Sequence, residues 1–268
     1  MKAMRSLKNR PIGIFDSGIG GLTVARSIRK CLPEEDIIYF GDTARVPYGN
    51  KSKATIIRFA REIMAFMLDN KVKIVVVACN TASSLGLRSL KESYKTPVIG
   101  VIDPGVKEAA RITETGRVGV IGTSSTVGSG AYKKGLKKVA PSARLFSAAC
   151  PLFVPLVENR HINDKITLDI ARGYLEPLKK KKIDLLILGC THYPILKTVI
   201  KKVMGKVKLV DSSSVVAKEV KRILSEEDLR ADRRRGKMKC FVSDDVEGFR
   251  KSAGIFLREK INVSKAVL

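Results

Sequence analysis

Short runs of β-branched and other apolar residues alternate along this chain with segments of helical periodicity. The runs that we predict to be strands are Pro11–Asp16, Asp36–Phe40, Lys73–Ala78, Val98–Ile102, Arg117–Ile121, Ala143–Ser147, Asp184–Leu188, Val207–Val210 and Lys239–Val242. Strands that alternate with helices predict α/β units with parallel sheets. The strands are apolar without alternation, which is typical of sheets that are covered on both faces.

Two of the intervening segments carry the apolar stripe of an amphipathic helix. The first stripe follows Ser52, a plausible N-cap, and consists of Ile56, Phe59, Ile63 and Phe66. In the second segment Pro177 is expected to kink or end the helix, and the stripe consists of Ile166, Ile170, Tyr174 and Leu178. A role in the core explains both stripes better than a cofactor role does.

A strand that ends in a polar turn occurs twice in each half of the chain at similar spacing, and the second turn of each half contains a cysteine, Cys79 or Cys190. At roughly 150 residues per domain, 268 residues suggest about two domains. Two similar α/β domains that face each other would place both cysteines at one interface. Ligands bind beyond the carboxyl ends of such strands and between domains.

The formal charge of +25 is large for a chain of this length, and it includes the basic runs Lys179–Lys182 and Arg230–Lys239. A solvated face is the simplest interpretation of each run. Binding to nucleic acid or another polyanion, and attraction of an acidic small substrate, are the alternatives. No sequence pattern of a known nucleic-acid-binding module accompanies the charge, so we treat nucleic-acid binding as secondary.

The cysteine content and the hydropathy favour a cytoplasmic protein. The five cysteines are widely spaced and include no CxxC pair, which argues against a disulfide framework and a zinc ribbon. The basic segment Met1–Arg10 is not followed by an apolar region, so it does not resemble a secretory signal. The longest apolar run, Ile74–Cys79, is the length of a strand, so we expect no membrane insertion.

Three strand ends carry polar motifs that suit chemistry. The turn Asp16–Thr23 resembles a dinucleotide fingerprint, but Thr23 occupies the last glycine position. Its free N–H groups could hold a carboxylate at the start of a helix. Cys79 precedes a helix with Asn80 or Thr81 as a possible cap, and a thiol near a helix N-terminus has a lowered pKa and more thiolate. A buried structural cysteine, the commoner fate of a lone Cys, is the alternative.

The third motif, Gly189–Pro194, places Cys190 beside His192, close enough to share a proton. A zinc site that included Cys79 would lack ligands at recognisable spacing. A Cys-His hydrolase pair is possible but leaves Cys79 without a role. The loop Val46–Asn50 contains Tyr48 and Gly49, which could touch a ligand, although turn chemistry alone explains its Pro and Gly.

Taken together, these motifs resemble the glutamate racemases of the peptidoglycan pathway, within the aspartate/glutamate racemase superfamily. The resemblance runs from about Pro11 to Leu257. It is carried in order by FDSGIGGLTV (Phe15–Val24), PYG (Pro47–Gly49), ACNTAS (Ala78–Ser83), the IGT to SGAY stretch (Ile121–Tyr132), PLVE (Pro155–Glu158) and GCTHYP (Gly189–Pro194). Ser125, where the family often has glycine, and the strong basic charge depart from the pattern.

The resemblance implies two α/β domains with the active site at their interface, the first formed by 11–102 plus 211–268 and the second by 103–210. It implies interconversion of L- and D-glutamate without a cofactor or metal, in which Cys79 removes the α-proton of the D-isomer and Cys190 that of the L-isomer. Asp16, Glu158 and His192 would tune the thiols, and Thr123 and Thr126 are weaker candidates. The residues that would hold the substrate are Asp16, Ser17, Tyr48, Gly49, Asn80, Thr81, Thr191 and His192.

Three further expectations complete the sequence-based account. The partner is the small molecule glutamate, and the protein is expected to form a homodimer. A related racemase or decarboxylase that acts on another acid is an alternative, but the DSG and PYG motifs favour the glutamate branch. A non-enzymatic binder of nucleic acid is the second alternative, and it would have no need of paired cysteines at strand ends.

Overall fold

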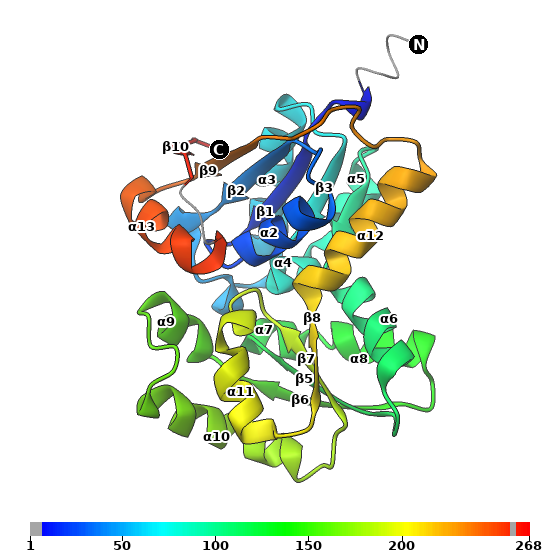
Figure 1. Cartoon of the computed structure of the whole chain (residues 1–268), viewed down its shortest axis with the longest axis vertical. Helices are drawn as coiled ribbons and strands as arrows, with labels where there is room; N and C mark the ends of the chain where they lie inside the picture. The colour runs from blue at the N-terminus through cyan, green and yellow to red at the C-terminus, as the bar shows by residue number, and fades with distance from the viewer. Residues whose placement is uncertain (1–6, 258–260) are drawn as a thin grey trace. The chain divides into compact units, whose positions relative to one another are not determined.

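The computed structural model describes residues 7–257 and 261–268, and the chain divides into two compact units (Figure 1). The first unit comprises the chain up to Val101 and from Ser213 onward, and the second comprises Ile102–Ser212. Residues 1–6 of the basic amino-terminal segment, which does not resemble a secretory signal, lie outside the described residues. No helix in the described ranges is both long and apolar enough to cross a membrane.

A six-stranded parallel sheet forms the centre of the first unit, in the order β10-β9-β2-β1-β3-β4. Its strands are β1 (Ile12–Asp16), β2 (Ile37–Gly41), β3 (Ile74–Val77), β4 (Val98–Gly100), β9 (Met238–Val242) and β10 (Val263–Lys265). Every residue of β1, β2, β3 and β4 is buried, as expected of strands covered on both faces.

Helices cover this sheet (Figure 1), and α2 packs against α13 while α3 packs against α4 and α5. The helices are α2 (Leu22–Cys31), α3 (Lys53–Asp69), α4 (Asn80–Leu85), α5 (Leu87–Ser93), α12 (Ser212–Glu226) and α13 (Val246–Leu257), with 3-10 turns at Thr43–Arg45 and Tyr48–Asn50. Ser52 caps α3 as predicted, because its side chain accepts a hydrogen bond from the Thr55 N–H at 3.2 Å.

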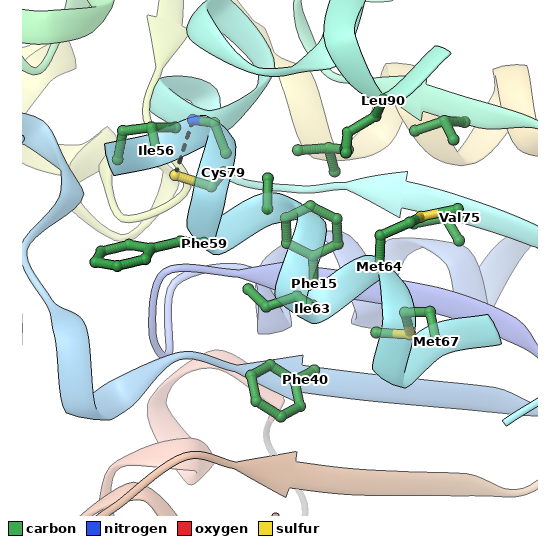
Figure 2. Close-up of a cluster of buried hydrophobic side chains, with 14 of the residues drawn as sticks. Phe15, Phe40, Ile56, Phe59, Ile63, Met64, Met67, Val75, Cys79 and Leu90 are labelled. Carbon is green, nitrogen blue, oxygen red and sulfur yellow. Dashed lines mark hydrogen bonds between the residues drawn. The ribbon is translucent and has the colours of Figure 1, made fainter. Parts of the chain in front are cut away.

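The predicted stripe of α3 forms part of one hydrophobic cluster with the strands (Figure 2). Ile56, Ile63 and Met64 are fully buried against Phe15 of β1. Figure 2 shows Cys79 beside Ile56 at one end of the cluster, at the carboxyl end of β3. The core of the unit therefore fixes the backbone that carries this cysteine.

The amino-terminal edge of the sheet contains a buried ion pair between Lys73 and Glu35, whose side chains are both inaccessible to solvent. The Lys73 ammonium also donates to the carbonyl oxygens of Lys8 and Leu229, each at 2.7 Å, and the Ala231 N–H donates to Glu35 at 2.8 Å. Burial raises the pKa of Glu35 and lowers that of Lys73. The pair fastens the segment around Leu229–Ala231 to the sheet.

The second unit is built on a four-stranded parallel sheet in the order β6-β5-β7-β8. Its strands are β5 (Arg117–Gly122), β6 (Arg144–Ala149), β7 (Leu185–Gly189) and β8 (Lys208–Asp211). Its helices are α6 (Ile102–Ile112), α7 (Ser124–Gly128), α8 (Ala131–Val139), α9 (Phe153–Glu158), α10 (Lys165–Lys179) and α11 (Lys197–Met204), with a 3-10 turn at Tyr193–Leu196. The α/β class with two parallel sheets is thus confirmed.

Two details differ from the sequence-based expectation. The strand predicted over Val98–Ile102 ends at Gly100, and Ile102 begins α6 instead. Pro104 lies in the first turn of α6, where its missing N–H has no intrahelical partner to lose. The second predicted stripe also differs, because Ile166 is 59% exposed and α10 buries a different set of residues, Thr167, Ala171, Leu175 and Leu178. Pro177 lies in the last turn of α10, which ends at Lys179.

Candidate active site

At the carboxyl edge of the first sheet, Asp16 is the last residue of β1, and Cys79 lies just after the adjacent strand β3. The two strands pair in parallel, and the Ala78 N–H donates to the Phe15 carbonyl at 2.8 Å. The Asp16 carboxylate is fully buried, and it accepts a hydrogen bond from the Gly18 N–H at 3.1 Å. The sheet therefore brings together two of the predicted site residues that are far apart in sequence.

The sulfur atom of Cys79 caps α4. It accepts a hydrogen bond from the Ala82 N–H at 3.5 Å, shown dashed in Figure 2, and it lies 3.7 Å from the Ser17 hydroxyl. The prediction that Asn80 or Thr81 caps this helix was therefore wrong, because both are buried residues of its first turn. An N–H aimed at the sulfur at a helix N-terminus favours the thiolate form.

The glycine turn after β1 uses three of its N–H groups within the turn itself. The N–H groups of Leu22, Thr23 and Val24 donate to carbonyl oxygens three residues earlier in the same turn, at 3.0–3.1 Å. A side chain at Gly21 would place its Cβ 2.4 Å from the Cβ of Asp16. The turn thus serves to pack tightly behind Asp16, and these three N–H groups are already used.

The predicted ligand residue Tyr48 is buried, and its hydroxyl donates to the carboxylate of Asp42. Asp42 also accepts from Ser243 at 2.9 Å and from Arg45 at 2.7 Å. Burial, and then the charge of Asp42, raise the pKa of Tyr48. The Tyr48 hydroxyl is therefore held inside the unit, and Gly49 follows it in the same 3-10 turn.

Asp42 was not among the residues that we selected from the sequence. The signal that could have found it is its position, because it directly follows the buried strand β2 in the way that Asp16 ends β1. A fully buried acidic side chain at a strand end requires partners. It finds them in the loop after β2 and in Ser243, which follows β9.

In the second unit, Cys190 follows β7 and belongs to a chain of three side chains. Its sulfur lies 3.9 Å from Nδ1 of His192, and Nε2 of His192 lies 3.0 Å from the carboxylate of Glu158 at the end of α9. Burial lowers the pKa of His192, but hydrogen bonds with Cys190 and Glu158 outweigh it and raise the pKa to about 10. The arrangement favours an imidazolium beside the Cys190 sulfur.

The remaining candidates of the second unit lie close to strand ends. Thr191 is buried beside Cys190. Thr123, after β5, caps α7 by accepting from the Thr126 N–H at 3.2 Å, and the two hydroxyls lie 3.0 Å apart. Their hydrogen bonds give both residues a structural role in the start of α7.

Two cysteines outside these motifs have a different environment from Cys79. Burial raises the pKa of Cys150, and it raises that of Cys240 to about 12. Both thiols therefore remain protonated near neutral pH. Within the described residues, no three His, Cys, Asp or Glu side chains cluster in the way that a metal site requires.

The fold and these strand-end residues define a class of α/β protein in which each of two parallel sheets has a cysteine just after a central strand. The sequence profile of the Asp/Glu/Hydantoin racemase family matches residues 20–220, so the chain belongs to that family. A glutamate racemase from Geobacter metallireducens is 49% identical over 254 residues, which cover 94% of each chain.

Solved structures of glutamate racemases have the same fold as this chain. An isoform from Bacillus anthracis superposes with a TM-score of 0.95 at 40% identity, covering 97% of this chain and 98% of that one. A glutamate racemase from Francisella tularensis in complex with D-glutamate superposes with a TM-score of 0.91, also at 40% identity and with the same coverage.

Proposed function

We propose that this chain interconverts L-glutamate and D-glutamate by exchanging the α-proton between two thiols, Cys79 and Cys190. The observation that carries the proposal is that each thiol follows a buried parallel strand and has a polar partner at its sulfur. That partner is the Ala82 N–H for Cys79 and His192 for Cys190. The similarity to glutamate racemases over nearly the whole chain supports glutamate as the substrate.

Racemisation removes a proton from one face of Cα and returns a proton to the other face. It therefore needs two acid/base groups that reach the same carbon from opposite sides, one as the base and the other as the acid. A thiol has a reference pKa of about 8.5 and can populate either form near neutral pH. Cys79 takes the α-proton of D-glutamate, and Cys190 takes that of L-glutamate.

The groups around each thiol have separate roles in this proposal. Around Cys79, the buried carboxylate of Asp16 tunes the thiol, and the Ala82 N–H favours its thiolate form. Around Cys190, the imidazolium of His192 stabilises a thiolate, and Glu158 holds the ring in place. Neither Asp16 nor His192 carries the α-proton itself.

Substrate binding requires hydrogen-bond donors for the charge that develops on the carboxylate as the α-proton leaves. The residues proposed to hold glutamate are Asp16, Ser17, Tyr48, Gly49, Asn80, Thr81, Thr191 and His192. Because the Tyr48 hydroxyl donates a hydrogen bond to Asp42, we propose that Tyr48 shapes the glutamate-binding site and that the backbone of Gly49 makes a polar contact with the substrate.

The wider role follows from the product. D-glutamate supplied by this reaction is used in peptidoglycan, and all five cysteines are free thiols, which supports a reducing compartment such as the cytoplasm. We further propose a homodimer. The positive charge supports weak, salt-sensitive contact with nucleic acid as a secondary property.

The proposal is tested by incubating the purified protein with L-glutamate in heavy water, without added cofactor. Optical rotation should fall toward zero while deuterium enters at Cα, because each turnover returns a solvent-derived proton. If racemisation occurs only after pyridoxal phosphate is added, the two-thiol mechanism is wrong.

A further inference from the structure

A pocket lined by four cationic side chains lies in the first unit. Its cavity of about 220 Å³ is bounded by Arg26, Arg29 and Lys30 of α2, by Arg235 ahead of β9, and by Leu257 at the end of α13. We call it the basic pocket. Arg26, Lys30 and Arg235 are exposed at its rim.

The basic pocket is separate from the candidate active site of the same unit. Pro33 and Gly236, which also line it, precede β2 and β9, so they lie at the amino-terminal edge of the sheet. Asp16 and Cys79 lie at the carboxyl edge. A ligand in the basic pocket therefore cannot be the molecule that reacts at Cys79.

The wall that carries Arg235 is held firmly against the sheet. The Gly236 N–H donates to the Pro33 carbonyl at 2.9 Å, and the Ile37 N–H donates to the Lys237 carbonyl at 2.8 Å. A Cβ at Gly236 would lie 2.0 Å from the Glu35 carbonyl oxygen, so only glycine permits this close approach. The pocket therefore has a fixed backbone on this side.

Arg235 differs from two other arginines of its own segment. Arg230 pairs with Glu34, and Arg233 pairs with Asp36. Within residues 7–257 and 261–268, Arg26, Lys30 and Arg235 form no ion pair, and no carboxylate lines the pocket. Like charges gathered around one cavity raise the local potential and attract anions.

We propose that the basic pocket binds a compact phosphate anion, for which inorganic diphosphate is the simplest probe. Guanidinium groups pair with phosphate oxygens through two parallel hydrogen bonds, and three arginines line this cavity. No aromatic side chain of the described residues lines it, so nothing there would stack on a nucleobase. The ligand is recognised through its phosphate groups.

Isothermal titration calorimetry of the full chain with diphosphate, at physiological ionic strength, tests this proposal. The wild-type protein should bind one diphosphate saturably. The double variant Arg26→Ala/Lys30→Ala should weaken binding by about tenfold or more, because it removes charge-assisted contacts. The control Lys180→Ala/Lys181→Ala removes the same charge from an exposed run of the second unit and should change affinity by less than about twofold.

Three results would overturn the proposal. The first is that diphosphate does not bind saturably to the wild-type protein. The second is that the control variant loses as much diphosphate affinity as the pocket variant, which would indicate a general effect of charge. The third uses a short DNA duplex in the same assay, because a duplex spreads its phosphates over a long surface. Pocket-dependent duplex binding that diphosphate fails to displace would show that the site serves nucleic acid. Circular dichroism verifies that both variants are folded.

Discussion

The Sγ atom of Cys190 lies 3.9 Å from Nδ1 of His192, while the other nitrogen of the same ring lies 3.0 Å from Glu158. The histidine thus stands between a thiol and a carboxylate, both of which favour its protonated form. Its side chain is nearly inaccessible, whereas that of Glu158 is 40% exposed. This link gives the second thiol a built-in counter-ion, whereas Cys79 relies on an N–H at the start of α4.

We expect His192 to remain protonated well above neutral pH, since hydrogen bonds with Cys190 and Glu158 raise its pKa to about 10 despite its burial. A pH titration of the histidine ring resonances by NMR measures this directly. The chain has only two histidines, so the variant His161→Asn assigns the signals. Glu158→Gln and Cys190→Ala should each lower the pKa of His192, and a titration near 6.5 in the wild type would refute the assignment.

The same shift has a consequence for stability. The folded state retains the His192 proton between the ordinary pKa of 6.5 and about 10, whereas the unfolded state releases it. This contribution is fully present below pH 6.5 and is lost as the pH rises through about 10. Urea unfolding of wild type and His192→Asn over this range should show a steeper fall for the wild type, and parallel curves would contradict the prediction.

Glutamate should be turned over with a higher specificity constant than aspartate, by about 10–200-fold, the range that one methylene group supports in a fitted pocket. The reason is that the relatives matched over nearly the whole chain are glutamate racemases. Initial rates of both L-amino acids, followed by circular dichroism, provide the test. Comparable specificity constants would place the chain in another branch of the family.

The buried pair Lys73–Glu35 should be a major determinant of the stability of the first unit. Lys73→Met leaves the Glu35 carboxylate buried without its cation, which should lower the free energy of unfolding by about 3–5 kcal/mol. Urea denaturation followed by circular dichroism measures the change. The double variant Lys73→Met/Glu35→Leu should recover part of the loss, because it removes both buried charges.

A matched control is the exposed pair Arg88–Glu92 of α5, whose side chains are 91% and 61% exposed. Arg88→Ala should leave the denaturation midpoint unchanged within error, since solvent screens such a pair. If Lys73→Met lowers the free energy of unfolding no more than Arg88→Ala does, the buried pair does not stabilise the first unit as we infer.

The strands of this fold could be predicted because their signal is local. Nine predicted strands overlap β1 to β9, since each is a short apolar run bounded by turn residues. The strand β10 (Val263–Lys265) was missed because it has three residues and only Val263 is buried. Its pairing with β9 depends on a neighbour in space that no local pattern reveals.

The site was harder to predict in its details than in its members. The motifs identified Cys79 and Cys190. They did not predict that the Cys79 side chain caps α4, because cysteine is not among the usual cap residues. The partner of the Tyr48 hydroxyl was missed for another reason, since Asp42 is held jointly by a loop and by Ser243, which lies far along the chain. Hydrogen bonds of this kind follow from the sheet order and not from spacing.

The most direct test of the two-thiol account is the rate of racemisation in both directions for Cys79→Ala and Cys190→Ala. Each variant should lose at least about 10²–10⁴-fold in turnover from either enantiomer, because every cycle needs one thiol as base and the other as acid. Asp16→Asn and His192→Asn should cost less, since these groups tune the thiols. Cys31→Ala, Cys150→Ala and Cys240→Ala should remain nearly as active as the wild type.

Circular dichroism measures the rate of racemisation through the optical activity of glutamate, and it also verifies that each variant is folded. The account predicts that neither enantiomer is converted at an appreciable rate when either Cys79 or Cys190 is replaced. A folded Cys79→Ala or Cys190→Ala protein that racemises glutamate at nearly the wild-type rate would contradict it.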